Sequence, residues 1–317
     1  MFSISSINNN GFDIIRLVDE ATQTMVDVIP ACGGILHAFA ITQQDKMMNI
    51  VDSYNNKNEF EEAMEAKGFK SAKLSPFVCR MRDGKYHFGE KDYRVNKFYL
   101  GEHAIHGLIY DAPFEVTHQM ADEEKAVLEL LHHYKGTDAG YPFLYDCKIV
   151  YELKMNNSLT ITTSVINKDR GMIPVCDGWH PYFTFGGSID ECQLEFQSKE
   201  LVAFDDTLVP DGKLIPYQEF GSLKKIETTF LDNCFTVNFA ECQPMLILRD
   251  PKQKIQLEIR PEKSYPYLQI YTPPHRQSIA IENLSSAPDA FNNGMGLVTL
   301  PEGEAVSFTT NYTIVIL

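Results

Sequence analysis

Candidate chemistry centres on one aromatic stretch, Pro174–Phe185, which reads PVCDGWHPYFTF and holds the single tryptophan, Trp179, beside His180. A histidine titrates close to neutral pH, so its surroundings decide whether it can act as an acid or a base. A histidine among aromatic side chains can equally be a packed core residue whose ring nitrogens are satisfied by hydrogen bonds. Which of the two applies depends on the other polar side chains that the fold brings to His180.

Glu282 is a second candidate for acid–base chemistry. The residues before it, Ile279, Ala280 and Ile281, have the character of a buried strand. A carboxylate inside such a strand must be paired or hydrogen-bonded, because an isolated buried charge costs several kcal/mol. Glu282 is therefore either a general base or a carboxylate at the solvent-facing end of a strand.

Three further polar positions interrupt apolar surroundings. They lie in CRMRDG (residues 79–84), in NKFYLGEHAIHG (residues 96–107), and at Asp232 within FLDNCF. The second of these stretches supplies His103 and His106. These segments are far apart in the sequence, so only a fold that gathers them could make one site.

The spacing of the histidines argues against a metal centre. His132 and His133 are adjacent and would point to opposite faces of a strand, and His103 and His106, three residues apart, are separated in the same way. The chain has no H-E-x-x-H motif, no G-x-S-x-G nucleophile elbow, and only an isolated G-x-G at residues 294–296. We therefore expect no metal and no cofactor.

Strand patterns dominate the chain. Segments such as FDIIRLVDE, LYDCKIVYELKM and SLTITTSVIN recur at short intervals between turn residues, which predicts an all-β sandwich or barrel. We expect residues 1–317 to form a single domain in which two large antiparallel sheets pack face to face. The exception is a short helix over Asn58–Lys67, capped by Asn58 and ended by Gly68. Gly33-Gly34 predicts a bulge or a close backbone approach, and the turn after KYHF predicts a hairpin.

The amino-acid composition limits the classes of binding partner that we expect. With 28 basic and 43 acidic residues the formal charge is −15, which repels phosphate backbones and anionic lipid, so we expect neither nucleic acid nor membrane as a partner. The seven scattered cysteines fit reduced thiols, and the first residues lack the pattern of a secretory signal. A cytoplasmic location follows as an expectation, whereas the oligomeric state is not predicted.

Taken in order, seven segments resemble the aldose 1-epimerase (galactose mutarotase-like) superfamily. They are CRMRDGKYHF, NKFYLGEHAIHG, GWHPYF, FLDNCF, YLQIY, IAIENLSSAPDAFNNG and LPEGE. The resemblance extends from Gly33-Gly34 to the C-terminus. It implies a large antiparallel β-sandwich with a monosaccharide site in a cleft on one sheet.

The resemblance also implies roles for individual residues. His180, in the H-P-Y-F motif, would be the general acid, and Glu282 the general base, in opening the ring of an aldose such as glucose or galactose. Here the neighbouring carboxylate is expected to favour the charged imidazole. Trp179, Tyr182 or Phe183 would offer the sugar a flat apolar wall. The expected substrate-binding residues are His106, Arg80, Asp232, Gln269, Tyr271 and Trp179.

Two departures from the family pattern bear on the substrate. Cys79 stands where an asparagine usually precedes the arginine, and Leu108 follows His106-Gly107 where relatives acting on hexose 6-phosphates carry an arginine soon afterwards. Three alternatives stay open: a hexose-6-phosphate 1-epimerase, a non-catalytic sugar-binding protein on the same fold, and a lyase or hydrolase of longer glycans.

Overall fold

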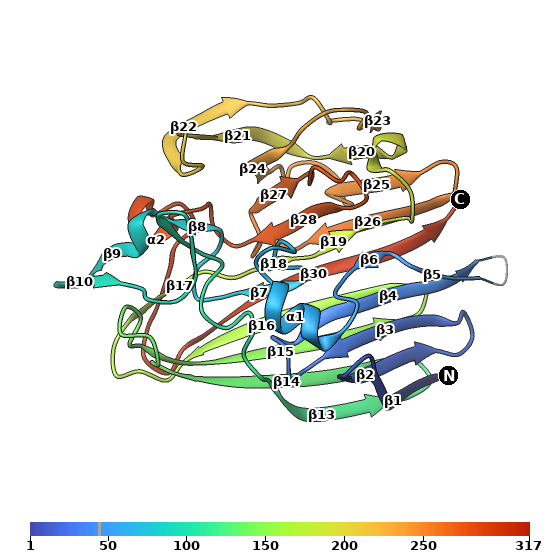
Figure 1. Cartoon of the computed structure of the whole chain (residues 1–317), viewed down its shortest axis with the longest axis horizontal. Helices are drawn as coiled ribbons and strands as arrows, with labels where there is room; N and C mark the ends of the chain where they lie inside the picture. The colour runs from blue at the N-terminus through green and yellow to red at the C-terminus, as the bar shows by residue number, and fades with distance from the viewer. Residues whose placement is uncertain (44–45) are drawn as a thin grey trace.

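The fold is almost entirely β-structure, as Figure 1 shows. The computed structural model describes residues 1–43 and 46–317, and its two largest sheets each contain nine strands. Within both sheets, neighbouring strands run antiparallel. The expected all-β architecture of large antiparallel sheets is confirmed.

The first large sheet includes several long strands in which buried side chains alternate with more exposed ones. In β16, for example, every second residue from Leu159 to Asn167 is buried, because successive side chains of a strand point to opposite faces. In spatial order, its strands are β13 (Glu115–Ala121), β14 (Lys125–Lys135), β15 (Leu144–Lys154), β16 (Ser158–Asn167), β30 (Ala305–Ile316), β26 (Ile255–Pro261), β25 (Leu246–Asp250), β20 (Gln193–Phe196) and β23 (Lys224–Lys225).

The second large sheet carries most of the candidate residues. All six residues of its strand β28 are buried, which fits a strand covered on both faces. In spatial order, its strands are β22 (Pro210–Pro216), β21 (Ser198–Phe204), β24 (Asp232–Val237), β27 (Tyr267–Tyr271), β28 (Ile279–Leu284), β18 (Gly178–His180) and β7 (Ala72–Leu74), with β19 (Tyr182–Phe183) joining β28 to β6 (Val51–Asp52).

The inner faces of the two sheets pack against each other. The ring of Tyr151 on β15 lies 6.1 Å from that of Trp179 on β18, and the ring of Phe183 on β19 lies 5.7 Å from that of Tyr312 on β30. These side chains belong to one apolar cluster that draws residues from both sheets. The opposite face of the second sheet is therefore the face available for a site.

Smaller elements surround these sheets, and the β9–β10 hairpin projects from one end (Figure 1). A five-stranded sheet contains β1 (Phe2–Asn9), β2 (Phe12–Asp19), β3 (Thr24–Ile29), β4 (Ile35–Gln43) and β5 (Lys46–Asn49). The remaining strands are β8 (Arg80–Met81), β11 (Tyr99–Leu100) and β12 (His103–Ile105), the hairpin β9 (Lys85–Phe88) and β10 (Lys91–Arg94), and the pair β17 (Ile173–Val175) and β29 (Val298–Leu300).

The expected helix is present but displaced. Helix α1 spans Lys57–Ala63 and is capped by Asn56, whose side chain accepts a hydrogen bond from the backbone N–H of Glu59 at 2.9 Å. The prediction of Asn58 as the cap was therefore wrong, because Asn56 has the extended backbone that an N-cap requires. Turns continue beyond α1 to Gly68, which has a φ of +77°. The second helix, α2, covers Ala290–Asn293, and short 3₁₀ turns cover Arg82–Gly84 and Ile189–Glu191.

Two local predictions are confirmed. At Gly33 a β-carbon would lie 2.0 Å from the backbone oxygen of Tyr110, so only glycine allows this close approach. The β9–β10 hairpin closes through Gly89-Glu90, with Phe88 paired to Lys91. Among the described residues, no helix is long and apolar enough to cross a membrane.

Candidate active site

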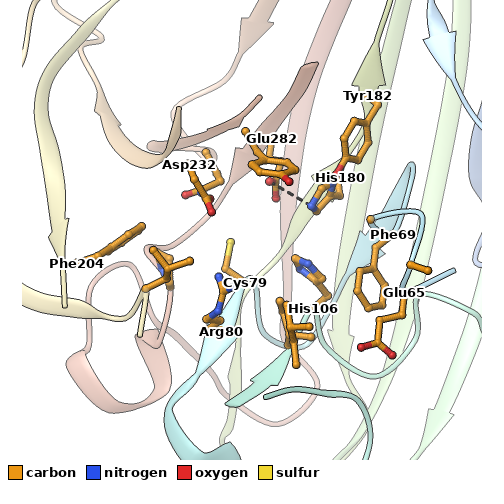
Figure 2. A pocket seen from close by; sticks show the side chains of 18 residues that line it. Glu65, Phe69, Cys79, Arg80, His106, His180, Tyr182, Phe204, Asp232 and Glu282 are labelled. Carbon is orange, nitrogen blue, oxygen red and sulfur yellow. Dashed lines mark hydrogen bonds and ion pairs between the residues drawn. The ribbon is translucent and has the colours of Figure 1, made fainter. Parts of the chain in front are cut away.

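A cavity of about 280 Å³ lies on the outer face of the second sheet. Figure 2 shows side chains from several sequence-distant segments converging on it. Seven of the eight predicted site residues line this cavity: Arg80, His106, His180, Asp232, Gln269, Tyr271 and Glu282. The fold thus brings together most of the residues that the motif series singled out.

His180 and Glu282 face each other across the adjacent strands β18 and β28. Their position follows from the register, because the pairs Gly178–Leu284 and Tyr182–Ala280 flank them on either side. Directly opposed side chains in an antiparallel pair lie close enough to interact. The Nε2 atom of His180 lies 3.4 Å from Oε1 of Glu282, and both side chains are buried.

The row of polar side chains continues across the sheet. Gln269 on β27 is the register partner of Glu282, and its Nε2 donates a hydrogen bond to Oδ1 of Asp232 at 3.0 Å. Asp232 stands at the start of β24, opposite Tyr271. The alternation of side chains puts Gln269 and Tyr271 on the same face of β27. A continuous polar surface therefore runs over four neighbouring strands.

His106 and Arg80 come from the small sheet that borders the cavity. Arg80 on β8 pairs with Ile105 on β12, and His106 follows directly. The backbone N–H of His106 donates to the carbonyl of Cys79 at 2.9 Å, and its φ of +63° is unusual for a residue with a side chain. This conformation places the His106 ring edge-on to that of His180, with centroids 4.8 Å apart at 90°.

Burial shifts the charge states of these groups. It raises the pKa of Glu282 well above the ordinary value, an effect that the negative Asp232 strengthens and the positive Arg80 opposes. Burial also lowers the pKa of His180 to about 4 and that of His106 well below the ordinary value. The expectation that the carboxylate keeps His180 charged was thus wrong, because burial removes the hydration of the imidazolium and also favours the neutral form of Glu282.

Several buried polar atoms at the cavity lack partners. His180 Nδ1, His106 Nδ1, Gln269 Oε1 and Glu282 Oε2 form no hydrogen bond with another described residue. Leaving a buried polar atom unpaired costs about 1–3 kcal/mol. Four such atoms around one cavity indicate a polar small molecule as the natural occupant.

The charges around the cavity are mainly negative. Among its described lining residues, Arg80 is the one cation, whereas Glu65, Asp232 and Glu282 carry carboxyl groups. No group of three or more potential metal-binding side chains occurs within residues 1–43 and 46–317. The lining thus favours hydrogen-bonded recognition of hydroxyl groups over recognition of a phosphate.

Trp179 does not reach the cavity. It is almost fully buried on the inner face of β18, where its ring contacts that of Tyr151 and lies 4.5 Å from the Nζ atom of Lys73. The prediction that Trp179 forms a wall of the site was wrong, because adjacent strand residues point to opposite faces and His180 occupies the cavity side. Phe183 is likewise in the core, whereas Tyr182 lines the cavity.

The sequence analysis did not identify several other residues that line the cavity. Glu65, Gly68 and Phe69 reach the cavity from the turns after α1, and Phe204 and Leu208 reach it from the β21–β22 connection. No motif marks these positions. The one available signal was the helical interruption of a β scaffold, which we interpreted only as a short excursion.

Comparison with known proteins agrees with this geometry. A sequence model of the aldose 1-epimerase family matches residues 15–313. An uncharacterized protein of Escherichia coli (strain K12), YihR, is 26% identical over 242 residues, which cover 73% of this chain and 74% of that protein.

Solved structures show the same fold. A galactose mutarotase-like protein from Clostridium acetobutylicum has a TM-score of 0.87 at 19% identity, covering 100% of this chain and 99% of its own. The galactose 1-epimerase from Lactobacillus acidophilus NCFM has a TM-score of 0.81 at 17% identity, with 99% and 98% covered. The structural likeness establishes the shared fold, and the family match over nearly the whole length shows that the chain belongs to the aldose 1-epimerase family.

Proposed function

We propose that this protein is an aldose 1-epimerase that interconverts the α and β anomers of a free aldose such as glucose or galactose. The observation that carries the proposal is the His180–Glu282 pair, 3.4 Å apart at the base of the cavity. A cavity of about 280 Å³ is near the lower end of small-molecule sites and suits one monosaccharide. The substrate of the galactose 1-epimerase from Lactobacillus acidophilus supports a hexose.

The reaction needs one acid and one base. Glu282, as a carboxylate, takes the proton of the anomeric hydroxyl, and His180, as an imidazolium, gives a proton to the ring oxygen. The C1–O5 bond breaks, leaving an aldehyde, a neutral carboxyl group and a neutral imidazole. Rotation about C1–C2 and the reverse proton transfers close the ring on its other face. Each positioned transfer contributes on the order of 10²–10⁴-fold in rate.

Of the two proton arrangements, the cavity favours the neutral one, so the ionic pair that begins the reaction is the minor form in the free enzyme. Burial raises the pKa of Glu282 and lowers that of His180, so it favours the neutral pair that accompanies the open aldehyde. Arg80 acts in the opposite direction on Glu282 and favours the carboxylate that begins the reaction. The low-dielectric cavity thus lowers the free energy of the ring-opened state relative to the closed one.

The remaining polar residues would hold the sugar. We assign hydroxyl binding to Asp232, Gln269 and Tyr271, and orientation of the ring-oxygen region to His106 and Arg80. Gln269 Oε1 and His106 Nδ1 are buried without partners among the described residues, so each can bond to a bound sugar. In this scheme no metal or cofactor takes part in any step.

A hexose 6-phosphate is a weaker candidate substrate. Leu108, which stands where an arginine would support phosphate binding, is buried in the core, and three carboxyl groups surround the cavity against one guanidinium. A free monosaccharide is therefore the partner we propose, with no nucleic acid and no membrane. We also propose that residues 1–317 act as one cytoplasmic domain, since the main apolar cluster extends from Phe2 to Ile314.

The test is mutarotation of freshly dissolved α-D-glucose and α-D-galactose, followed by polarimetry and by NMR exchange between the anomers. Wild type should accelerate equilibration, and Glu282→Gln and His180→Asn should each reduce kcat by at least about 10²-fold while keeping the circular dichroism spectrum. Wild-type binding of these sugars in calorimetry without acceleration would show a sugar-binding protein instead. Full activity of Glu282→Gln would refute the role of this residue as the base.

A further inference from the structure

Four aromatic rings form a continuous row along the wall of the cavity. The ring of Phe69 lies 4.8 Å from that of His106, and the His106 ring lies 4.8 Å from that of His180. The His180 ring in turn stacks on Tyr182 at 5.2 Å and 23°. Figure 2 shows Phe69, His106, His180 and Tyr182 on one side of the cavity. Both histidines therefore lie between two other rings.

One short turn, residues 68–71, contacts this row at three points. Phe69 is itself the first ring of the row. Gly68 lies against the last ring of the row, that of Tyr182, since a β-carbon on Gly68 would be 2.5 Å from the Tyr182 hydroxyl oxygen. The backbone N–H of Ser71 donates to the carbonyl of His180 at 2.9 Å. We call residues 68–71 the Gly68–Ser71 turn.

The backbone of this turn has an unusual conformation. Phe69 and Ser71 both have a φ of +55°, in the left-handed region that residues with side chains rarely adopt. Phe69 is nevertheless buried, with its ring 5.1 Å from that of Tyr110. Strained conformations that the surrounding structure maintains tend to occur at functional sites.

Ring packing restrains both histidines at positions where their Nδ1 atoms have no hydrogen-bond partner in another described residue. A functional histidine is commonly fixed by a hydrogen bond at its second ring nitrogen. Here Nδ1 of His106 and Nδ1 of His180 form no hydrogen bond with another described residue. The contacts with Phe69 and Tyr182 therefore restrain the imidazoles in addition to the contact between His180 Nε2 and Glu282.

We propose that the Gly68–Ser71 turn is a positioning device for proton transfer, in which Phe69 and Gly68 set the orientation of the His106 and His180 rings. This inference rests on the proposed acid–base function. Phe69 and Gly68 act through the histidines and transfer no proton themselves. A small rotation of His180 would carry its Nε2 away from Glu282, and misplacement by about 1 Å can reduce a rate by about 10²-fold.

Gly68→Ala tests the contact with Tyr182. The new methyl group meets the Tyr182 hydroxyl, so kcat should fall by about 10-fold or more while KM changes by less than about threefold. Tyr182→Phe removes the obstructing oxygen, and in the Gly68→Ala background it should restore a large part of the lost kcat. Failure of Tyr182→Phe to restore any activity there would overturn the proposed contact.

Gly89→Ala is the matched control. Gly89 has a φ of +63° in the β9–β10 turn, and a β-carbon there meets nothing within 4 Å. The Gly89→Ala variant therefore places an alanine in the same left-handed backbone conformation without contacting the row of rings. Both variants should lose thermal stability, but only Gly68→Ala should lose kcat. An equal loss of kcat in the control would reduce the effect to general destabilisation and refute positioning.

Phe69→Leu tests the other end of the row, with Phe39→Leu as its control because Phe39 is fully buried and does not line the cavity. Phe69→Leu should reduce kcat by about 10-fold, and Phe39→Leu should not. Side-chain NMR provides a readout independent of activity: the imidazole resonances of His106 should shift in Phe69→Leu and stay unchanged in the control.

The two hypotheses fail in different ways. A wild-type protein without mutarotation would refute the proposed function, while the NMR signals would still report whether Phe69 orients His106. An active wild type whose Phe69→Leu variant keeps both its kcat within about twofold and its histidine resonances would refute the positioning role alone.

Discussion

Lys73 and Asp177 form an ion pair with no solvent exposure directly behind the strand that carries His180. The Nζ atom of Lys73 lies 2.5 Å from the carboxylate of Asp177 and donates to the carbonyl of Gly178 at 3.1 Å. The hydroxyl of Tyr265 donates to the same carboxylate at 2.6 Å. Burial lowers the pKa of Lys73 and raises that of Asp177, and the attraction between them opposes both effects. Buried polar groups therefore lie on both sides of β18, with His180 on the cavity side and the Lys73–Asp177 pair on the other.

Breaking this buried pair should be costly. Lys73→Met leaves Asp177 without its cation and should lower the free energy of unfolding by about 3–5 kcal/mol, whereas adding Asp177→Asn should recover part of that loss. Urea denaturation measures both. The control is Lys213→Met, which breaks the more exposed Lys213–Asp211 pair and should cost far less stability because water screens that pair. Equal losses at the two sites would contradict the prediction.

His180 should make the protein less stable in acid. Its pKa in the folded protein is about 4, below the ordinary 6.5. Between these values the unfolded chain binds a proton that the folded site excludes, so stability falls as the pH drops from about 6.5 to about 4. His180→Asn should remove about 3 kcal/mol of that fall, since each pKa unit corresponds to about 1.4 kcal/mol. Urea denaturation at pH 7 and pH 4 measures it, and an unchanged pH dependence would refute it.

Glu282 should have the opposite pH dependence. Its pKa in the folded protein is raised above the ordinary 4.5, so the unfolded chain releases a proton above pH 4.5 that the folded site retains. Stability therefore falls as the pH rises from 4.5 towards the pKa of the folded protein. Glu282→Gln should abolish this fall, so its stability relative to wild type should be higher at pH 8 than at pH 4. Thermal melts at the two pH values would show it; a loss at pH 8 would contradict it.

The neighbours of Glu282 should move the pH–rate profile. The negative charge of Asp232 raises the pKa of Glu282, and the positive charge of Arg80 lowers it. The active form carries a carboxylate on Glu282 and an imidazolium on His180, and the pKa of Glu282 is the higher of the two, so kcat/KM should fall with pH through the pKa of Glu282 in the free enzyme. Asp232→Asn should shift that fall to lower pH and Arg80→Met to higher pH, each by about one unit. Shifts in the same direction for both variants would refute the assignment of the base.

The charge of the cavity should exclude phosphorylated sugars. Arg80 shares the lining of the cavity with the carboxyl groups of Glu65, Asp232 and Glu282. Bringing a phosphate into this lining places like charges together in a poorly solvated space. We expect kcat/KM for glucose 6-phosphate to be at least about 10²-fold below that for glucose, measured by NMR exchange between anomers. Comparable values would instead support a hexose-6-phosphate 1-epimerase.

Local patterns in the sequence predicted the all-β fold, and the family resemblance that they carry predicted seven of the residues that line the cavity. Alternating strands predicted the antiparallel sheets, and the ordered motifs singled out His180, Glu282, His106, Arg80 and Asp232. Such patterns are visible because hydrophobic alternation and short motifs depend on residues that are close in sequence. The lining of the cavity by these residues is a consequence of strand register, which the motifs implied only through the family resemblance.

Only the tertiary structure decided the rest. Because side chains alternate along a strand, the sequence predicts that Trp179 and His180 point to opposite faces of the sheet. It does not predict which of the two faces the cavity. The packing of Trp179 against Tyr151 from the other sheet decides this. Phe69 reaches His106 from a turn on a different segment of the chain, and no local pattern marks that contact. The pKa values of His180 and Glu282 are set by burial, which distant segments create together, so the sequence identified the two groups while the fold determined their charge.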